Sequence, residues 1–232
     1  MTGELREALG LSKPPIGIGF LNEIPAGLQA WSEGEMPASC SFWREAMNGR
    51  AFYTVPADHY NCAVGSYTHS IAIPEEHGPV LNETIGFMVG SGYLQMAEVP
   101  GIPVLPKAPA FVAYAPMDQA NFPVDVVLMA ATPASAMLIY EAALRAGAGD
   151  ALTQTLGRPG CAVLPLAVGT EKASLSFGCK GNRTFTGLPD GEMYIAIPGS
   201  KWDAVVKAAG EIVAANAAMG AHYEKHAAAV RG

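Results

Sequence analysis

The amino-acid sequence predicts an α/β or α+β fold, with a mixed β-sheet in two lobes and a long C-terminal helix. Three observations support this prediction. Residues 110–115 and 124–130 are apolar runs of strand length that contain β-branched residues. A threonine–proline pair follows, suited to an N-cap and a first helical position, and residues 134–146 then show helical spacing. Residues 200–230 are alanine-rich with apolar residues on one helical face, which indicates one long helix.

The remaining segments add shorter elements. Thr2 is placed to cap a first helix that ends at a glycine, and Ser39 or Cys40 is placed to open a second. The strand at 124–130, the helix at 134–146 and an apolar run at 161–166 together predict a β-α-β unit. Further strands are expected at residues 16–21, 51–55, 161–166, 174–177 and 193–197. Further helices are expected at residues 3–9, 40–47 and 81–93.

A proline-rich stretch between residues 100 and 109 is the best candidate for a boundary between the lobes. It separates an N-terminal lobe, residues 1–100, from a C-terminal lobe, residues 101–232, which holds the β-α-β unit and the final helix. Each lobe carries two of the four cysteines of the chain. We expect the two lobes to form one integrated domain.

Charge and composition narrow the possible partners. Half of the residues are hydrophobic, only 15% are charged, and the net charge is −7, which argues against nucleic acid held through its phosphates. The N-terminus lacks the apolar run of a secretory signal, and the apolar stretches are interrupted before they reach a membrane-spanning length. The sequence therefore predicts a cytoplasmic protein without a membrane or nucleic-acid partner. The alanine-rich final helix suits a contact in a homo-oligomer.

The cysteines are Cys40, Cys62, Cys161 and Cys179, each in a segment rich in turn residues. Four thiolates are the number needed for a zinc site or an iron–sulfur cluster. In a reducing compartment, metal ligands, redox groups and buried filler side chains are all more common than structural disulfides. Zinc sites usually take ligands from close pairs such as Cys-x-x-Cys, which this chain lacks. A [4Fe–4S] cluster is therefore preferred to zinc, if the fold brings the sulfurs together.

The segment around Cys179 has the most distinctive local chemistry. Glycines flank the thiol, and Lys180 and Arg183 supply positive charge that would lower its pKa. A positive φ at Gly178 or Gly181 would expose backbone amides to an anion or to a cluster sulfur. Lys180, Asn182 and Arg183 are thus predicted to surround a bound cofactor. The alternative is a tight turn in which the cysteine only packs.

Two other functions stay open at this stage. One is a metal-free enzyme with Cys179 or Cys62 as nucleophile, in which Arg183 holds a small anionic substrate and His59 or Glu192 moves protons. The other is a non-catalytic module for a small anionic or tetrapyrrole ligand such as heme, with a cysteine or histidine as axial ligand. Whether the protein is an enzyme is left undecided. A redox function would imply an electron-transfer partner.

Familiar enzyme motifs are missing from the sequence. It has no phosphate-binding Gly-x-x-x-x-Gly-Lys-Ser/Thr loop, no Gly-x-Ser-x-Gly elbow and no complete dinucleotide fingerprint. His222 and His226 lie four residues apart but lack the His-Glu-x-x-His order of metalloproteases. A frayed helix end explains this pair better than a metal site.

Four blocks of the sequence resemble a known family. They are residues 39–46, 58–65, 157–161 and 176–186, of which Gly-Cys-x-Gly-Asn-Arg, residues 178–183, is the most specific. They are similar to the domain-of-unknown-function family numbered 169, found in bacteria and archaea, over about residues 5–215. The resemblance implies that the cysteine blocks belong to a shared scaffold, which favours ligands or reactive thiols over filler. It implies no particular activity, and Ala63 departs from a proline in the family pattern.

Overall fold

The computed structural model describes residues 1–150, 154–156 and 158–231. Within them, one mixed sheet of eight strands has the order β2-β3-β4-β1-β5-β8-β7-β6. This confirms an α+β class with a mixed sheet. The strands are β1 (Ile16–Leu21), β2 (Gln29–Ala30), β3 (Phe52–Thr54), β4 (Phe111–Pro116), β5 (Val126–Ala131), β6 (Gln154–Leu156), β7 (Ser174–Ser176) and β8 (Met193–Pro198).

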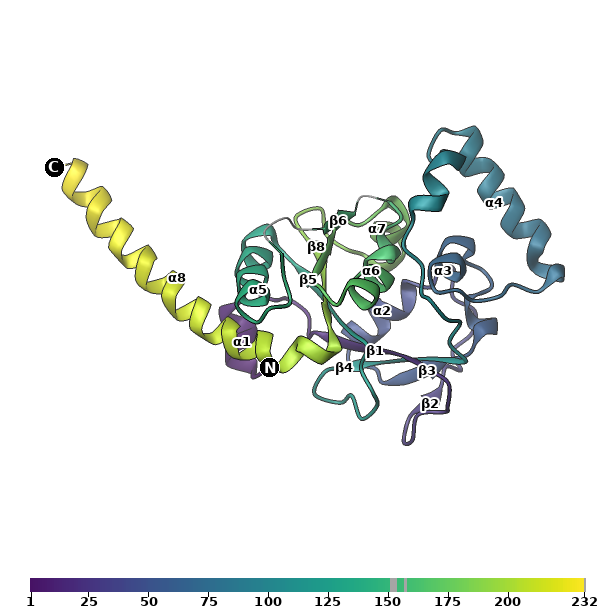
Figure 1. Ribbon diagram of the computed structural model, residues 1–232, viewed down its shortest axis with the longest axis horizontal. Helices are drawn as coiled ribbons and strands as arrows, with labels where there is room; N and C mark the ends of the chain where they lie inside the picture. Colours follow the sequence, from purple (N-terminus) through teal and green to yellow (C-terminus); the bar gives the residue numbers. More distant parts are fainter. Residues whose placement is uncertain (151–153, 157, 232) are drawn as a thin grey trace.

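The helices lie on both faces of this sheet. The α-helices are α1 (Gly3–Ala8), α2 (Ser41–Met47), α3 (Ala63–Thr68), α4 (Gly78–Gly90), α5 (Pro133–Arg145), α6 (Val163–Thr170), α7 (Lys180–Thr186) and α8 (Trp202–Arg231). Short 3-10 turns are η1 (Pro56–His59), η2 (Glu75–His77), η3 (Met96–Gly101), η4 (Gly160–Ala162) and η5 (Gly199–Lys201). Figure 1 shows α1, α5 and α8 gathered on one side of β5 and β8, with α2, α3, α6 and α7 on the other.

Each face of the sheet has its own hydrophobic core. Strand β5 contributes to both, because successive side chains of a strand point to opposite faces. Val126 and Leu128 join the core under α2 and α6, whereas Val127 and Met129 join the core under α5 and α8. A strand buried on both faces is apolar at every position, which is why its sequence forms a continuous apolar run.

Strand β1 sits in the middle of the sheet, although it comes first in the chain. It pairs antiparallel with β4 from Ile16 to Leu21 and with β5 on its other side. Strands from residues 1–100 and from residues 101–232 thus share one hydrogen-bonded sheet. The cysteine blocks of both ranges are attached to this common frame.

The strand expected at residues 161–166 is wrong, because this segment forms η4 and the start of α6. Its side chains from Cys161 to Pro165 are all buried, and a fully apolar run does not distinguish a buried strand from a buried helix. Pro165 lies in the first helical turn, where its missing N–H would have no partner in any case. The β-α-β unit is instead completed by β6, which runs parallel to β5 with β8 and β7 between them.

The expected C-terminal helix is confirmed as α8. Its first turns pack against α5 and α1, and its distal half is exposed. By length and composition it is the one helix within the described residues that could cross a membrane. The exposed half of α8 carries two charged residues, Glu224 and Lys225. The cytoplasmic location of the protein stays a prediction.

Between α3 and β4 the chain makes an excursion, residues 71–104, which we call the arm. It consists mainly of η2, α4 and η3. Its two ends are tied together, because Leu105 N donates to Thr68 O at 2.9 Å and Ser70 Oγ donates to Leu105 O at 2.5 Å. Figure 1 shows α4 at the end of the molecule opposite to the tip of α8.

Candidate four-cysteine site

The four cysteines lie at the starts of four helices. Cys40, Cys62 and Cys179 are the N-cap residues of α2, α3 and α7, and Cys161 lies in η4, which leads into α6. All four are free thiols. The start of a helix presents backbone amides that have no partner within the helix, so each cysteine is placed beside hydrogen-bond donors.

Two of the sulfurs accept hydrogen bonds from these amides. Gly65 N donates to Cys62 Sγ at 3.2 Å, and Asn182 N donates to Cys179 Sγ at 3.5 Å. In return, the Asn182 side-chain oxygen accepts a hydrogen bond from Cys179 N at 3.1 Å, which completes a capping box. Donors of this kind stabilise a sulfur that carries negative charge, whether as a thiolate or as a metal ligand.

Two of the thiols are buried, and their pKa values respond to the other cysteines. Burial raises the pKa of Cys40 to about 12, and the charges of Cys62 and Cys179 add to this rise. Burial also raises the pKa of Cys161 well above its ordinary value, with further contributions from Cys62, Cys40 and Cys179. Cys40 and Cys161 therefore each lie close enough to the other three cysteines for their charges to interact.

Direct contacts connect the cysteine segments to one another. Thr68 Oγ1 donates to Cys161 Sγ at 3.5 Å, which links α3 to η4. Asn182, which is buried beside Cys179, also lies close enough to Cys40 to offset part of the rise in its pKa. An added Cβ at Gly65 would overlap Ser39 and lie 2.9 Å from Cys62 Sγ, so α2 and α3 approach each other closely.

Gly160 provides a test of this packing. A Cβ at this position would overlap Asn182 Oδ1 and lie 3.0 Å from Cys179 N. We expect Gly160→Ala to lower the free energy of unfolding by about 1–3 kcal/mol, as overpacking does. The matched control is Gly169→Ala in α6, where the Cβ meets nothing within 4 Å and a gain of about 0.5–1 kcal/mol is expected. Urea denaturation measures the free energy of unfolding of both variants. Equal changes in the two variants would contradict the close approach of Gly160 to Asn182.

His59 is buried, and both of its ring nitrogens are hydrogen-bonded. Its Nδ1 is 2.9 Å from Ser39 Oγ, and its Nε2 is 2.8 Å from Thr54 Oγ1. Burial, followed by the neighbouring His69, lowers the pKa of His59 to about 3. The imidazole is therefore neutral at pH 7, and both ring nitrogens are engaged in positioning the segment that precedes Cys40.

Several buried polar groups near the site have no hydrogen-bond partner within the described residues. They are Ser41 Oγ, Trp43 Nε1, Tyr114 Oη and both ring nitrogens of His69. An unpaired buried group costs about 1–3 kcal/mol. Ser41 directly follows Cys40, and the Trp43 ring lies edge-on to Tyr194 at 5.2 Å. Burial raises the pKa of Tyr194, and the charges of Cys40 and Cys179 add to that rise, so these groups lie near the sulfurs.

Arg183 stabilises the backbone around the site. Its guanidinium donates to Phe177 O at 2.6 Å, to Pro189 O at 2.7 Å and to Glu192 O at 3.2 Å. It thus ties the segment before Cys179 to the segment before β8. The sequence places the Arg183 cation near the Cys179 thiol. It does not reveal that the guanidinium is hydrogen-bonded to backbone carbonyl oxygens.

The other predicted residues around Cys179 lie in different positions. The Glu192 carboxylate accepts from Ser12 Oγ at 3.0 Å and therefore points toward the N-terminal segment. Lys180 is exposed in the first turn of α7. Gly178 has the predicted positive φ, of 75°, whereas Gly181 lies within α7. Cys179 thus begins a helix instead of forming an isolated tight turn.

Tyr93 of the arm joins the site without any indication in the local sequence. Its hydroxyl accepts from Lys180 N at 3.2 Å, across 87 positions of the chain. The guanidinium of Arg158 lies 4.8 Å from the centre of its ring. Burial raises the pKa of Tyr93, and the charge of Cys179 contributes to this rise. The arm therefore reaches the segment that carries Cys179.

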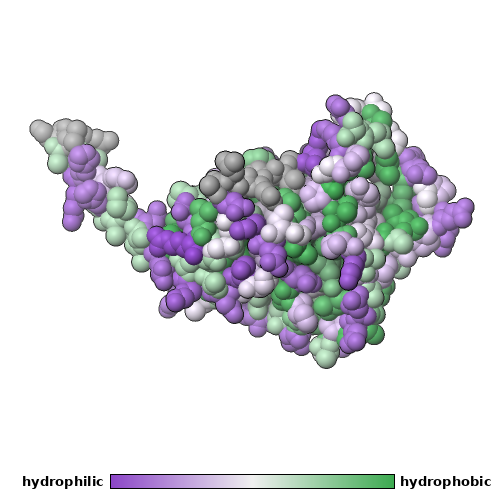
Figure 2. All heavy atoms as spheres, viewed as in Figure 1, coloured by the Kyte–Doolittle hydropathy of each residue, from purple (hydrophilic) through white to green (hydrophobic). Residues whose placement is uncertain are grey.

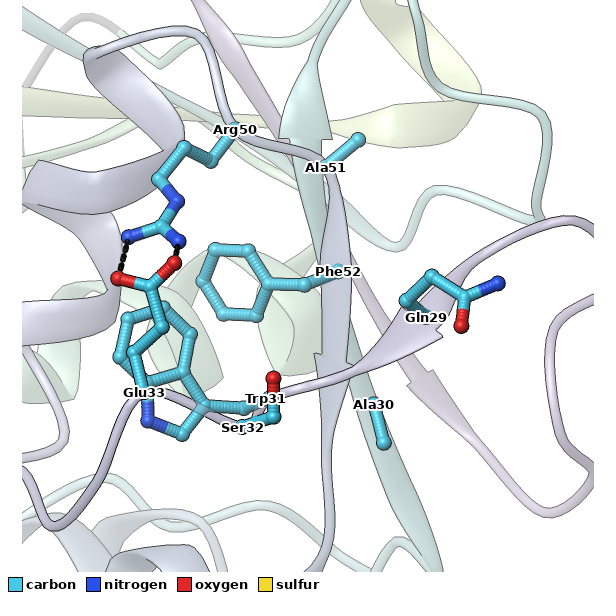
Figure 3. Close-up of a pocket in the computed structure, with 8 residues that line it drawn as sticks. All are labelled: Gln29, Ala30, Trp31, Ser32, Glu33, Arg50, Ala51 and Phe52. Carbon is cyan, nitrogen blue, oxygen red and sulfur yellow. Dashed lines mark hydrogen bonds and ion pairs between the residues drawn. The ribbon is translucent and has the colours of Figure 1, made fainter.

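A second concave site lies at the edge of the sheet, around β2 and β3. Figure 3 shows Arg50 paired with Glu33 there, beside the rings of Trp31 and Phe52. The Arg50 guanidinium lies 4.9 Å from the centre of the Trp31 ring. These side chains engage one another and hold the short β2 segment against β3, so we assign this pocket a structural role.

The fold and the site define a mixed α+β protein with four buried or half-buried cysteines at helix starts. The chain belongs to the DUF169 family, described as an uncharacterised ArCR family, whose model matches residues 4–208. It is 25% identical over 214 residues to the uncharacterised protein MJ0308 of Methanocaldococcus jannaschii, which covers 88% of this chain and 90% of that one. No solved structure matches the chain significantly.

Proposed function

We propose that the protein is a cytoplasmic redox or cofactor-binding protein that holds a [4Fe–4S] cluster through Cys40, Cys62, Cys161 and Cys179. The observation that supports this most directly is that Cys40 and Cys161 are buried close to the other cysteines, whose charges add to the rise in the pKa of each. When bound, such a cluster would supply one-electron chemistry. A reducing compartment would keep the cysteines available as thiolate ligands.

The positions of the cysteines along the chain favour a cluster over a single zinc ion, because the chain has no Cys-x-x-Cys pair. Sulfurs that share one zinc ion lie about 3.8 Å apart, given tetrahedral geometry and a Zn–S bond of about 2.3 Å. Within the described ranges, no three His, Cys, Asp or Glu side chains form a group ready to hold one ion. Thiolates that bind different irons of one cluster stand farther apart than those that share an ion.

The surroundings of the cysteines also suit a bound anionic group. Amides of Gly65 and Asn182 donate to two of the sulfurs, and the Ser41 hydroxyl is a buried donor beside Cys40. Hydrogen bonds to cluster sulfurs and an apolar surrounding shell both tune the reduction potential. The chain's own residues would thus orient the ligands and limit the access of water.

The direct test is reconstitution of anaerobically purified protein with iron and sulfide. We expect about four irons per chain and a visible absorption band that bleaches on reduction. Each of the four Cys→Ser variants should lose most of the bound iron. Tyr67→Phe, an exposed change on α3, is the control and should load as the wild type does. A colourless protein that takes up no iron after reconstitution would overturn the proposal.

A metal-free enzyme with a reactive Cys179 is the second candidate. It is favoured by the capping arrangement in which Asn182 N donates to Cys179 Sγ. The Cys→Ser variants distinguish the two functions. A nucleophile is lost only when one particular cysteine is replaced, whereas a shared cluster is damaged when any of the four is replaced. A Soret band in the purified protein would instead favour a tetrapyrrole ligand.

A further inference from the structure

One face of α8 carries a heptad stripe that is covered in its first half and exposed in its second. The residues of this face alternate at intervals of four and three, the spacing typical of coiled coils. They are Val205, Ala209, Ile212, Asn216, Met219, Tyr223 and His226. The first three are buried where α8 packs against α5. The last four are exposed, Met219 to 45% and Tyr223 to 62%, and we call these four the distal stripe.

The distal half of α8 projects away from the body of the protein. Figure 1 and Figure 2 show it standing clear of the helices that pack on the sheet. Residues 214–229 are all exposed, and at 1.5 Å per residue they span about 24 Å. Most helical stability in proteins comes from the packing of one face. Because the heptad spacing continues beyond the packed half, we infer that another helix covers the distal stripe.

The charges of this segment suit a second copy of the chain. No Lys, Arg, Asp or Glu occurs between Glu211 and Glu224. Glu224 and Lys225 lie about 120–140° around the helix from Met219, away from the distal stripe. Two identical helices can therefore meet through this stripe without bringing like charges together. A partner selected by its charge would find no group of opposite sign on it.

An antiparallel pairing of two copies matches the side chains of the distal stripe by kind. One alignment sets Met219 opposite Tyr223 of the second copy, and a thioether beside an aromatic ring is a favourable contact. The same alignment sets Asn216 opposite His226 of the second copy, because both pairs are centred on position 221. The amide and the imidazole can hydrogen-bond to each other. A parallel pairing would instead bring two bodies of one acidic chain, each chain with net charge −7, to the same end.

Gly220 lies beside the centre of this alignment. Glycine is a poor helix former, and a Cβ at this position would meet nothing within 4 Å in the single chain. The packing of the single chain therefore gives no reason for a glycine here. In the antiparallel pair, Gly220 of each copy flanks the two-fold axis, where the missing side chain lets the two helices approach closely.

We propose that the distal half of α8 forms an antiparallel two-helix interface with a second copy of this chain, through the distal stripe. Such an interface is isologous, so one stripe serves both copies. The proposal does not depend on the cluster, because α8 and the cysteine-bearing helix starts lie on opposite faces of the sheet. The dimer and the four-cysteine site can therefore be tested separately.

Sedimentation equilibrium of the purified chain tests for the dimer. We expect the wild type to dimerise, with a Kd that Met219→Glu raises at least about tenfold. Ala221→Glu places the same charge on the far side of the exposed helix and is the matched control, which should leave Kd unchanged. A wild type that stays monomeric at roughly 100 µM would overturn the proposal. A dimer that Met219→Glu does not weaken would overturn it too.

A charge swap tests the antiparallel register. Asn216→Lys and His226→Glu should each weaken the dimer, because each brings an unpaired charge into the interface. A chain that carries both changes should regain affinity, because antiparallel pairing sets the introduced cation of each copy opposite the introduced anion of the other. In a parallel pair, like charges would face each other at both positions. A double variant that dimerises no better than the single variants would overturn the antiparallel interface.

Discussion

Lowering the pH from 6.5 to 5 is expected to destabilise the folded protein by about 1.4 kcal/mol per pH unit for each of two buried histidines. Burial lowers the pKa of His59 to about 3 and that of His69 to about 4, from an ordinary 6.5. Above pH 6.5 the two histidines are neutral in both the folded and the unfolded chain, so they do not lower the free energy of unfolding. As the pH falls below 6.5, only the unfolded chain gains protons, so stability falls until the folded pKa values are reached.

Urea denaturation at pH 7, 6 and 5 measures this dependence. His69→Leu removes one of the two groups, and it should reduce the slope by about 1.4 kcal/mol per pH unit. Since both nitrogens of His69 are buried without a partner within the described residues, little stability should be lost at pH 7. His222→Leu, an exposed position of α8, is the control and should leave the slope unchanged. Parallel slopes for His69→Leu and the wild type would contradict the assignment.

Metal binding at the cysteines is expected to weaken at least about a hundredfold for each unit by which the pH falls below 8. Burial holds the pKa of Cys40 at about 12 and that of Cys161 well above its ordinary value, so both thiols carry protons at pH 7. A metal must displace both protons. The release of at least two protons per site changes the apparent affinity at least about a hundredfold per pH unit.

Cadmium is a suitable probe, because its thiolate bonds absorb in the ultraviolet and no sulfide is needed. Titrations at pH 6, 7 and 8 give the apparent affinity, and an indicator dye gives the number of protons released. Cys40→Ser should reduce both the affinity and the proton count, whereas Tyr67→Phe should change neither. An affinity that does not vary with pH would show that the buried thiols are not the ligands.

Elements with their own start and stop residues could be predicted from the sequence. Helix α5 is one example, since Thr132 caps it and its side chain accepts from Ser135 N at 3.2 Å. Strands β4 and β5 are another, because β-branched apolar runs favour extended backbone. Helix α6 was not predictable in this way. Its residues 163–169 are all apolar or glycine, so its sequence has no polar face to reveal a helical period.

The site was predictable in its residues more than in its contacts. The four cysteines and Asn182 could be selected from the sequence, because thiols, glycines and cations occur together there. Thr68 and Tyr93 could not, since each meets a cysteine segment across a long stretch of chain and neither belongs to a local motif. The hydrogen bonds of Arg183 to carbonyl oxygens likewise depend on how two separate segments pack.

The central place of β1 affects how the protein is made. A ribosome that has released β1 through β4 has also released Cys40 and Cys62, but α7 and Cys179 are still to be translated. A nascent chain therefore exposes half of its thiols before the other half exists. Any group that needs all four sulfurs must be inserted after synthesis is nearly complete, and oxidants met before that point act on an unfinished site.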